Sequence, residues 1–167
     1  RATFDYLAAE VLDRLDAGLR DFLLRTSVLH ELDVARCQAL GEGALVASFL
    51  AEIERLSLFV TVVDLTPHTL RLHQLFRDML QLRLRQEQPD THRQLLERAA
   101  MLESDPQRRH GLLMAAGRPE RAAELLLADA ALLINQLGAQ GLLDLAARFD
   151  EGFAEASPEL HRVKAVA

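Results

Sequence analysis

His73 and Arg77, which stand four positions apart, are the two residues whose types and spacing best suit the binding of a ligand. On an α-helix, side chains with this spacing lie on one face and can reach one target. An imidazole N–H and a guanidinium fork both donate hydrogen bonds to phosphate oxygens. If His73 opens a helix, the unpaired backbone N–H groups and the helix dipole add attraction for an anion. The pair is therefore a candidate phosphate-binding site.

The same two residues also have a purely structural interpretation. A histidine at the border of an apolar helix face can hydrogen-bond to nearby backbone, here that of the segment preceding the helix. Arg77 would then be solvated or paired with Asp78. Residue chemistry alone favours this structural interpretation over phosphate binding.

The remaining titratable residues predict neither catalysis nor metal binding. No GxxxxGK[ST] run is present, so the sequence lacks a phosphate-binding P-loop. None of the six histidines forms the i, i+4 pair of a helical zinc site. Cys37 falls on the apolar side of an expected short helix, which favours a buried thiol over a nucleophile. We therefore expect that this fragment is not an enzyme and that it holds no metal or cofactor by itself.

Composition supports a helix-rich globular protein. Half of the 167 residues are hydrophobic, only 5% are aromatic, and the formal net charge is -6. This acidic balance argues against a broad nucleic-acid surface. A single cysteine is typical of a reducing compartment, so we expect a cytoplasmic location. No apolar run approaches a membrane span, and the start at Arg1 without a signal peptide suggests a piece of a longer protein.

The first half of the chain has the pattern of a winged helix. We expect four helices. The first covers residues 2–15, the second begins after a cap at Asp16, the third begins after a cap at Asp33 and ends at Gly41, and the fourth covers residues 44–56. The last of these should bury Leu45, Phe49, Ile53 and Leu56. Residues 58–63 predict a strand, 64–68 a turn, and 69–72 a second strand with Leu70 and Leu72 on one face. We assign residues 1–88 to this winged-helix domain.

The rest of the chain is expected to be helical. The helix that begins near His73 should bury an apolar stripe of Leu72, Leu75, Phe76, Met79 and Leu82. Capped starts at Asp105-Pro106 and Ser157-Pro158, with breaks at Gly117 and Gly138, predict further helices. We assign residues 89–167 to a helical-hairpin region. The predicted fold class is mainly α, a winged-helix domain with a short β-hairpin followed by a tetratricopeptide-like array of helical hairpins.

Many winged helices read DNA, but the helix over 44–56 is poorly suited to that role. A reading helix offers Arg, Lys, Asn or Gln to base edges, with basic residues nearby for phosphates. Here the charged residues are Glu52, Glu54 and Arg55, and the two acids would repel DNA. We expect a structural or regulatory winged helix without direct DNA contact.

Five stretches give the chain a resemblance to a known family. They are residues 6–12 (YLAAEVL), 19–29 (LRDFLLRTSVL), 50–59 (LAEIERLSLF), 72–80 (LHQLFRDML) and 115–123 (AAGRPERAA). Together with the positions of Cys37 and His110, their order resembles that of the MalT-like, ATP-dependent LuxR-family transcriptional regulators of the STAND class. The resemblance covers most of residues 6–128.

This resemblance implies a preceding ATPase core, a following helical sensor of the same chain and a distant DNA-binding domain. It implies that the full-length protein binds ADP or ATP in that core. It also implies that His73, with Arg77 as the weaker candidate, contacts the phosphates of the bound ADP. It also implies self-association of the activated regulator. Leu72 stands where the family commonly has an aromatic residue, and the connection at 103–110 is shorter than usual. The ligand of the sensor is therefore not predictable.

Three functions remain open at this stage. The first is a regulatory winged helix and helical linker that couples nucleotide state and inducer sensing to transcription activation. The second is a helical protein-interaction scaffold in which His73 is structural. The third, and the least favoured by charge, is a direct DNA-binding winged helix.

Overall fold

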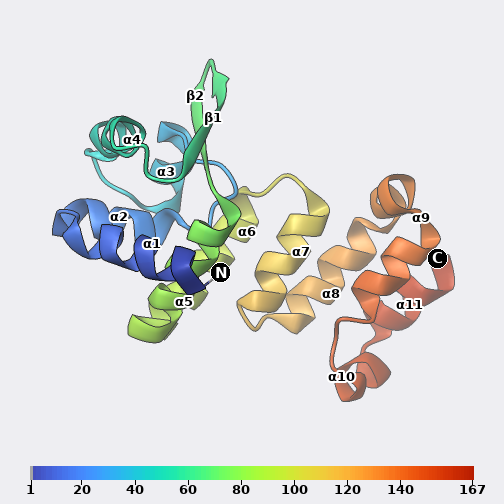
Figure 1. Cartoon of the computed structure of the whole chain (residues 1–167). Helices are drawn as coiled ribbons and strands as arrows, with labels where there is room; N and C mark the ends of the chain where they lie inside the picture. Colours follow the sequence, from blue (N-terminus) through green and yellow to red (C-terminus); the bar gives the residue numbers. More distant parts are fainter. Residues whose placement is uncertain (1) are drawn as a thin grey trace. The chain divides into compact units, whose positions relative to one another are not determined.

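The computed structural model describes residues 2–167, which contain eleven helices and a two-stranded sheet (Figure 1). The elements are α1 (Ala2–Arg14), α2 (Ala17–Thr26), α3 (Val34–Leu40), α4 (Val46–Arg55), β1 (Val60–Leu65), β2 (His68–Leu72), α5 (Gln74–Glu87), α6 (Pro89–Leu102), α7 (Pro106–Ala115), α8 (Pro119–Ala128), α9 (Ala130–Ala146), α10 (Glu151–Ala156) and α11 (Pro158–Val166). The mainly α fold class with a short hairpin is confirmed.

The chain divides into two compact units, Arg1–Leu102 and Glu103–Ala167. The first unit includes α6, because this helix packs against α3 and α5. The division expected from the sequence fell earlier, after residue 88. As functional domains, the ranges 1–88 and 89–167 remain a prediction, and so does the tetratricopeptide-like character of the second.

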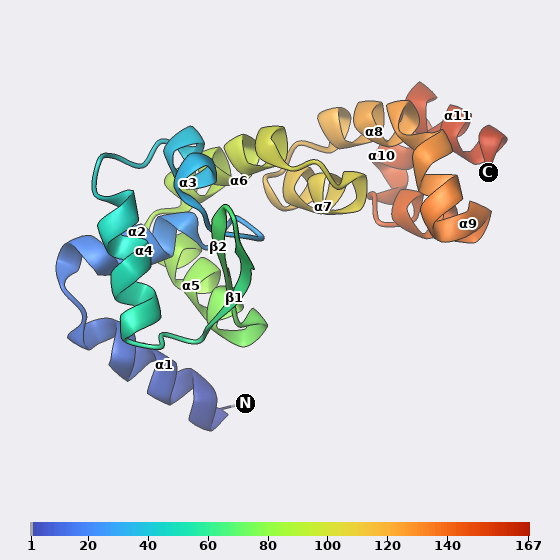
Figure 2. The ribbon, with the colours of Figure 1, turned by 90° about the horizontal axis from the view of Figure 1, so that it is seen from above.

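Local capping explains the first helices. Asp16 accepts the N–H of Gly18 at 3.0 Å, and Asp33 accepts the N–H of Arg36 at 2.7 Å, so both predicted caps are confirmed. Gly41 ends α3 with a φ of +113°, a left-handed conformation that glycine adopts without a steric penalty. Both α1 and α2 pack on α5, as the two views show (Figures 1 and 2).

The hairpin, which is the wing of the winged helix, stands out from the helices of the first unit (Figure 1). Its strands are antiparallel, with Val60 opposite Leu72, and a bulge interrupts the register between Val62 and Asp64. β1 continues to Leu65, beyond the predicted strand end at residue 63, which leaves a shorter turn than expected. On β2, Leu70 and Leu72 are both buried, as predicted.

A second backbone contact ties the wing to the helices. Leu32, which precedes α3, donates its N–H to the carbonyl of Leu70 and accepts the N–H of Leu70, both at 2.8 Å. The β2 strand is therefore held by β1 on one side and by Leu32 on the other. The side chains of Leu32 and Leu70 are also fully buried, so hydrogen bonding and apolar burial act at the same place.

The predicted buried face of α4 was partly wrong. Leu45 is 60% exposed and Leu56 is also exposed, because they lie outside the helix at its two caps. The residues that α4 buries are Val46, Leu50 and Ile53.

The predicted apolar stripe of α5 was partly right. Phe76 and Leu72 are buried as predicted, although Leu72 is the last residue of β2 and not part of the helix. The fully buried residues are Phe76, Leu80 and Leu84, spaced at i, i+4 and i+8. Leu82, predicted to be buried, is 45% exposed.

In the second unit, α7 and α8 form an antiparallel pair, and α11 packs on both α8 and α9. Asp105 and Ser157 cap their helices as predicted, by accepting the N–H groups of Arg108 and Leu160. Gly117, with a φ of +70°, follows α7, and Gly138, with a φ of +73°, kinks α9. The short helix α10 was not predicted. It begins at a cap on Asp150.

A buried histidine lies in the second unit. His110 of α7 is 2% exposed, its ring packs edge-on against Phe149 with centroids 5.4 Å apart, and neither ring nitrogen has a hydrogen-bond partner among the described residues. Burial, with a smaller contribution from the charge of Arg148, lowers the pKa of His110 to about 4. His110 is therefore neutral in the folded unit at pH 7.

No single helix within residues 2–167 combines the length and the apolar composition of a membrane span, and α8 and α9 have both only as a pair, across a 91° bend.

The core assignment of α5 predicts different costs for two neighbouring leucines. Leu80→Ala should lower the free energy of unfolding by about 2–5 kcal/mol, because it removes a fully buried side chain and leaves a cavity. Leu82→Ala on the exposed side should change it by less than about 0.5 kcal/mol. Urea denaturation followed by circular dichroism measures both, and equal losses would contradict the assignment.

The burial of His110 predicts a pH dependence of stability. The folded unit disfavours the protonated ring, so stability is fully present above pH 6.5 and is lost as the pH falls towards 4. The loss attributable to this group is roughly 3 kcal/mol. His110→Leu should flatten the slope of unfolding free energy against pH, whereas His161→Leu, at an exposed position, should keep the wild-type slope. Matching slopes in wild type and His110→Leu would refute this prediction.

Candidate functional site

His73 lies between the last residue of β2 and the first residue of α5, and its side chain is exposed. Its backbone N–H donates to the carbonyl of Phe59 at 2.7 Å, which extends the hairpin ladder by one pair. Its ring Nδ1 accepts the N–H of Leu75 at 3.3 Å, so the imidazole caps α5. The predicted strand-to-helix junction is confirmed, and the chain is fixed on both sides of the ring.

The capping contact also sets the chemistry of the ring. A neutral imidazole has one N–H and one unprotonated nitrogen. Because Nδ1 accepts the amide hydrogen, this arrangement assigns the proton to Nε2. The exposed ring thus offers an N–H donor at a helix N-terminus whose first turn contains no acidic side chain. Such a site suits an anionic group.

The His73 ring lies at one end of a series of aromatic contacts. The ring of Phe4 in α1 lies 5.8 Å from it, Phe59 lies 5.1 Å from Phe4, and Phe76 of α5 lies 5.0 Å from Phe59, as centroid distances. Phe59 has a φ of +53°, a conformation that costs energy for a residue with a side chain. The hydrogen bond from His73 to the Phe59 carbonyl and the ring contacts of Phe59 hold Phe59 in this conformation.

Arg77, the second predicted residue, has its own set of partners. Its Nη2 donates to Gln74 at 2.7 Å, and its Nη1 lies 3.2 Å from Nδ1 of His30, in the loop after α2. Asp78, the partner considered in the structural interpretation, accepts instead from Gln74. The structure thus places His73 against Phe4 and Leu75, and Arg77 against Gln74 and His30.

Other reactive groups are buried. Cys37 is fully buried, and burial raises the pKa of its thiol to about 12, so it is a poor nucleophile at neutral pH. Burial, followed by the charge of Arg85, lowers the pKa of His92 in α6. Among the residues whose side chains the structure describes, no cluster of three or more His, Cys, Asp or Glu has metal-binding geometry. The burial of His92 and His110 was missed by sequence reasoning, although their positions on the apolar sides of helices were a usable signal.

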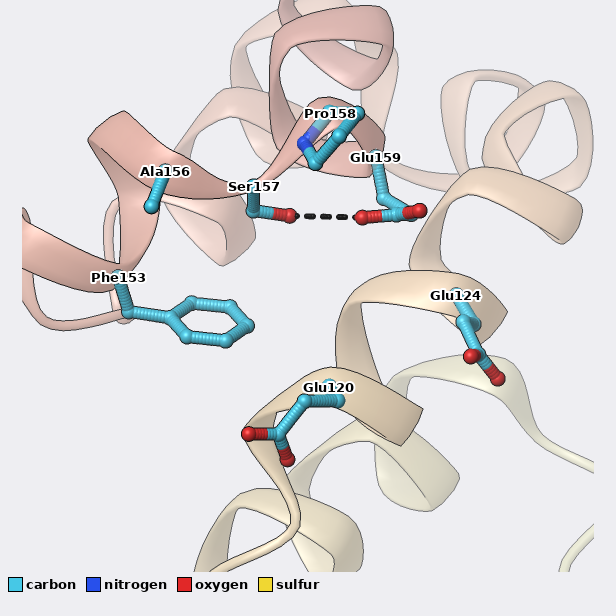
Figure 3. A pocket seen from close by; sticks show the side chains of 7 residues that line it. All are labelled: Glu120, Glu124, Phe153, Ala156, Ser157, Pro158 and Glu159. Carbon is cyan, nitrogen blue, oxygen red and sulfur yellow. Dashed lines mark hydrogen bonds between the residues drawn. The ribbon is translucent and has the colours of Figure 1, made fainter.

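The second unit has an open pocket of about 330 Å³ between α8, α10 and α11 (Figure 3). Its lining combines the ring of Phe153 with the carboxylates of Glu120, Glu124 and Glu159. Ser157 donates to Glu159 at 3.0 Å. A hydrogen bond from the backbone N–H of Glu159, followed by this one from Ser157, lowers the pKa of Glu159. Neither predicted site residue lines this pocket.

The acids of α4 have partners within the first unit. Glu52 forms an ion pair with Arg55 at 2.6 Å, and Glu54 lies 2.9 Å from His68 at the start of β2. Val62, Val63, Asp64 and Leu65 of the wing are exposed. The absence of direct DNA contact remains a prediction, and the acidic and apolar character of these surfaces supports it.

Comparison with known proteins gives one family match and several longer relatives. The family described as the MalT winged helix domain matches residues 8–92, slightly more than half of the chain. The HTH-type transcriptional regulator MalT of Klebsiella pneumoniae is 33% identical over 138 residues, which are 78% of this chain and 15% of that protein.

The serine/threonine-protein kinase PknK of Mycobacterium tuberculosis is also 33% identical, over 137 residues that cover 79% of this chain and 12% of that protein. The chain therefore spans less than a sixth of the length of either relative. The shared region extends beyond the winged helix, since 138 residues exceed the matched range of 8–92.

Proposed function

This chain belongs to the MalT winged helix domain family, and on that premise we propose that it is the regulatory part of a cytoplasmic, ATP-dependent transcriptional regulator. In this proposal the winged helix and the following helices couple nucleotide state and inducer sensing to transcription activation. The chain itself performs no catalysis. A preceding ATPase core and a following helical sensor of the same polypeptide are its partners.

The observation that carries the proposal is the placement of His73. Its ring is exposed, its Nδ1 is occupied by Leu75, and its Nε2–H is directed by the cap of α5. A single donor at a helix N-terminus fits a phosphate oxygen of ADP held by the neighbouring core. Bound ADP would supply the negative charge that this end of α5 attracts. His73 would thereby hold the winged helix in the resting arrangement.

Arg77 plays a supporting part in this scheme. Its hydrogen bonds to Gln74 and its contact with His30 connect α5 to the loop after α2. A guanidinium in this position adds positive charge one turn after His73. Exchange of ADP for ATP would then release the resting contact and permit self-association of the full-length regulator.

A helical protein-interaction scaffold is the second candidate. The observation in its favour is that capping α5 already gives the His73 ring a structural role, with Nδ1 satisfied by Leu75 at 3.3 Å. In that case the exposed Nε2–H would face solvent and nucleotides would have no influence on the chain.

His73→Asn in the full-length regulator separates the two functions. Asparagine is a good N-cap, so α5 should remain stable, whereas the shorter side chain withdraws the donor from the position of Nε2. We expect ADP affinity to fall by about 10- to 100-fold, the worth of one charge-assisted hydrogen bond, and basal promoter activity to rise. Isothermal titration calorimetry and a reporter assay measure these effects.

The matched control is His68→Asn, which removes another exposed histidine of the same wing and should leave ADP affinity unchanged. A thermal melt verifies that both variants are folded. Wild-type ADP affinity and basal activity in His73→Asn would favour the scaffold function and remove His73 from the nucleotide site.

A further inference from the structure

The hydrogen bond that holds the His73 ring is long. Nδ1 of His73 accepts the N–H of Leu75 at 3.3 Å, near the upper limit of hydrogen-bond geometry. The side chain is exposed, so water competes for the same nitrogen. An exposed imidazole held in this way can exchange between rotamers and between its two neutral tautomers. A second contact is therefore needed to keep Nε2–H in one place.

The ring of Phe4 supplies such a contact from another helix. The centroids of the Phe4 and His73 rings lie 5.8 Å apart, and their planes make an angle of 39°. This separation is within the range of about 4.5–7 Å over which aromatic rings attract each other. Phe4 belongs to α1, which packs on α5, and His73 caps α5. The contact thus joins the start of α1 to the start of α5.

Phe4 is itself held by buried residues. It lies on the side of α1 that faces the core, since Ala8 and Leu12, which follow at i+4 and i+8, are fully buried. Its ring packs edge-on against Phe59 at 5.1 Å, and Phe59 packs against the fully buried Phe76 at 5.0 Å, as centroid distances. A ring fixed in this way can restrain an exposed neighbour, because its own movement would break these contacts.

We propose that Phe4 is a positioning residue for His73. Its ring holds the imidazole in the orientation in which Nδ1 faces Leu75 and Nε2–H is available to a phosphate oxygen. Phe4 acts through His73, because an apolar ring has no donor to offer a phosphate. Since His73 is the residue that would contact ADP, this role of Phe4 rests on the proposed function. Helix α1, which lies outside the wing, thereby controls how His73 is presented.

The other role open to Phe4 is core packing alone. In that case an apolar side chain of similar size would serve equally well, and the state of the His73 ring would not depend on it. Leucine and tyrosine at this position separate the two roles. Leucine keeps the apolar packing and removes the ring contact, whereas tyrosine keeps both. Phe4 is half-buried, so the added hydroxyl can reach solvent.

NMR of the imidazole nitrogens in this chain tests the ring contact without a nucleotide. At a pH that keeps the ring neutral, we expect mainly the Nε2–H tautomer of His73 in wild type. In Phe4→Leu the preference for this tautomer should fall by about 2- to 10-fold, the equivalent of one aromatic pair. Phe4→Tyr should restore it. An Nδ1–H tautomer in wild type, or unchanged His73 signals in Phe4→Leu, would overturn the proposal.

The matched control is Tyr6→Leu. It removes another aromatic ring of α1, but the side chain of Tyr6 is 69% exposed. The His73 signals should therefore stay as in wild type. A change as large as that in Phe4→Leu would assign the effect to α1 in general and contradict a specific role of Phe4.

A double-mutant cycle in the full-length regulator tests whether Phe4 acts through His73. Phe4→Leu should weaken ADP binding by about 2- to 10-fold, which is less than the effect of His73→Asn. In the His73→Asn background the same change should have no further effect, because no imidazole is left to position. Phe4→Tyr and Tyr6→Leu should bind ADP as wild type does. Isothermal titration calorimetry measures the affinities, and a thermal melt verifies that each variant is folded.

The role of Phe4 and the proposed function fail in different ways. Wild-type ADP affinity in His73→Asn would refute the proposed function, and the role of Phe4 with it. Weakened binding in His73→Asn together with wild-type affinity in Phe4→Leu would overturn the role of Phe4 alone. Fully additive effects of the two changes would do the same, since Phe4 would then act independently of His73.

Discussion

The reciprocal backbone pairing of Leu32 with Leu70 is the constraint on which the rest of the first unit depends. It places β2 between β1 and the segment before α3, and both side chains are buried at the same point. An isolated two-stranded hairpin is marginally stable in water, so this additional contact and the buried leucines stabilise the wing. Because β2 leads directly into α5, the same contact also sets the start of that helix.

This one strand also determines where His73 lies. At its C-terminal end, the register that pairs Val60 with Leu72 continues to His73, whose N–H meets the carbonyl of Phe59 and whose ring caps α5. The position of the proposed nucleotide contact is therefore a consequence of how β2 is anchored.

The core of the second unit contains a polar side chain, the imidazole of His110, packed among apolar residues. His110 lies against Phe149, which stacks on Phe153 with centroids 5.5 Å apart, and Phe153 lines the acidic pocket. A buried imidazole with no hydrogen-bond partner costs stability. The helices around it thus tolerate a group whose protonation would oppose folding. The lowered pKa of His110 makes the stability of the second unit sensitive to acid.

Local sequence patterns were enough to predict the helix caps at Asp16, Asp33, Asp105 and Ser157, the hairpin, and the placement of His73 at a strand-to-helix junction, because these features depend on local backbone hydrogen bonds and short periodicity. Other features depend on the packing of distant segments. Leu80 and Leu84 of α5 are fully buried, Arg77 contacts His30, 47 residues away, and β2 is anchored by the distant Leu32. Such pairings join segments that are far apart in the chain, and no local pattern encodes them.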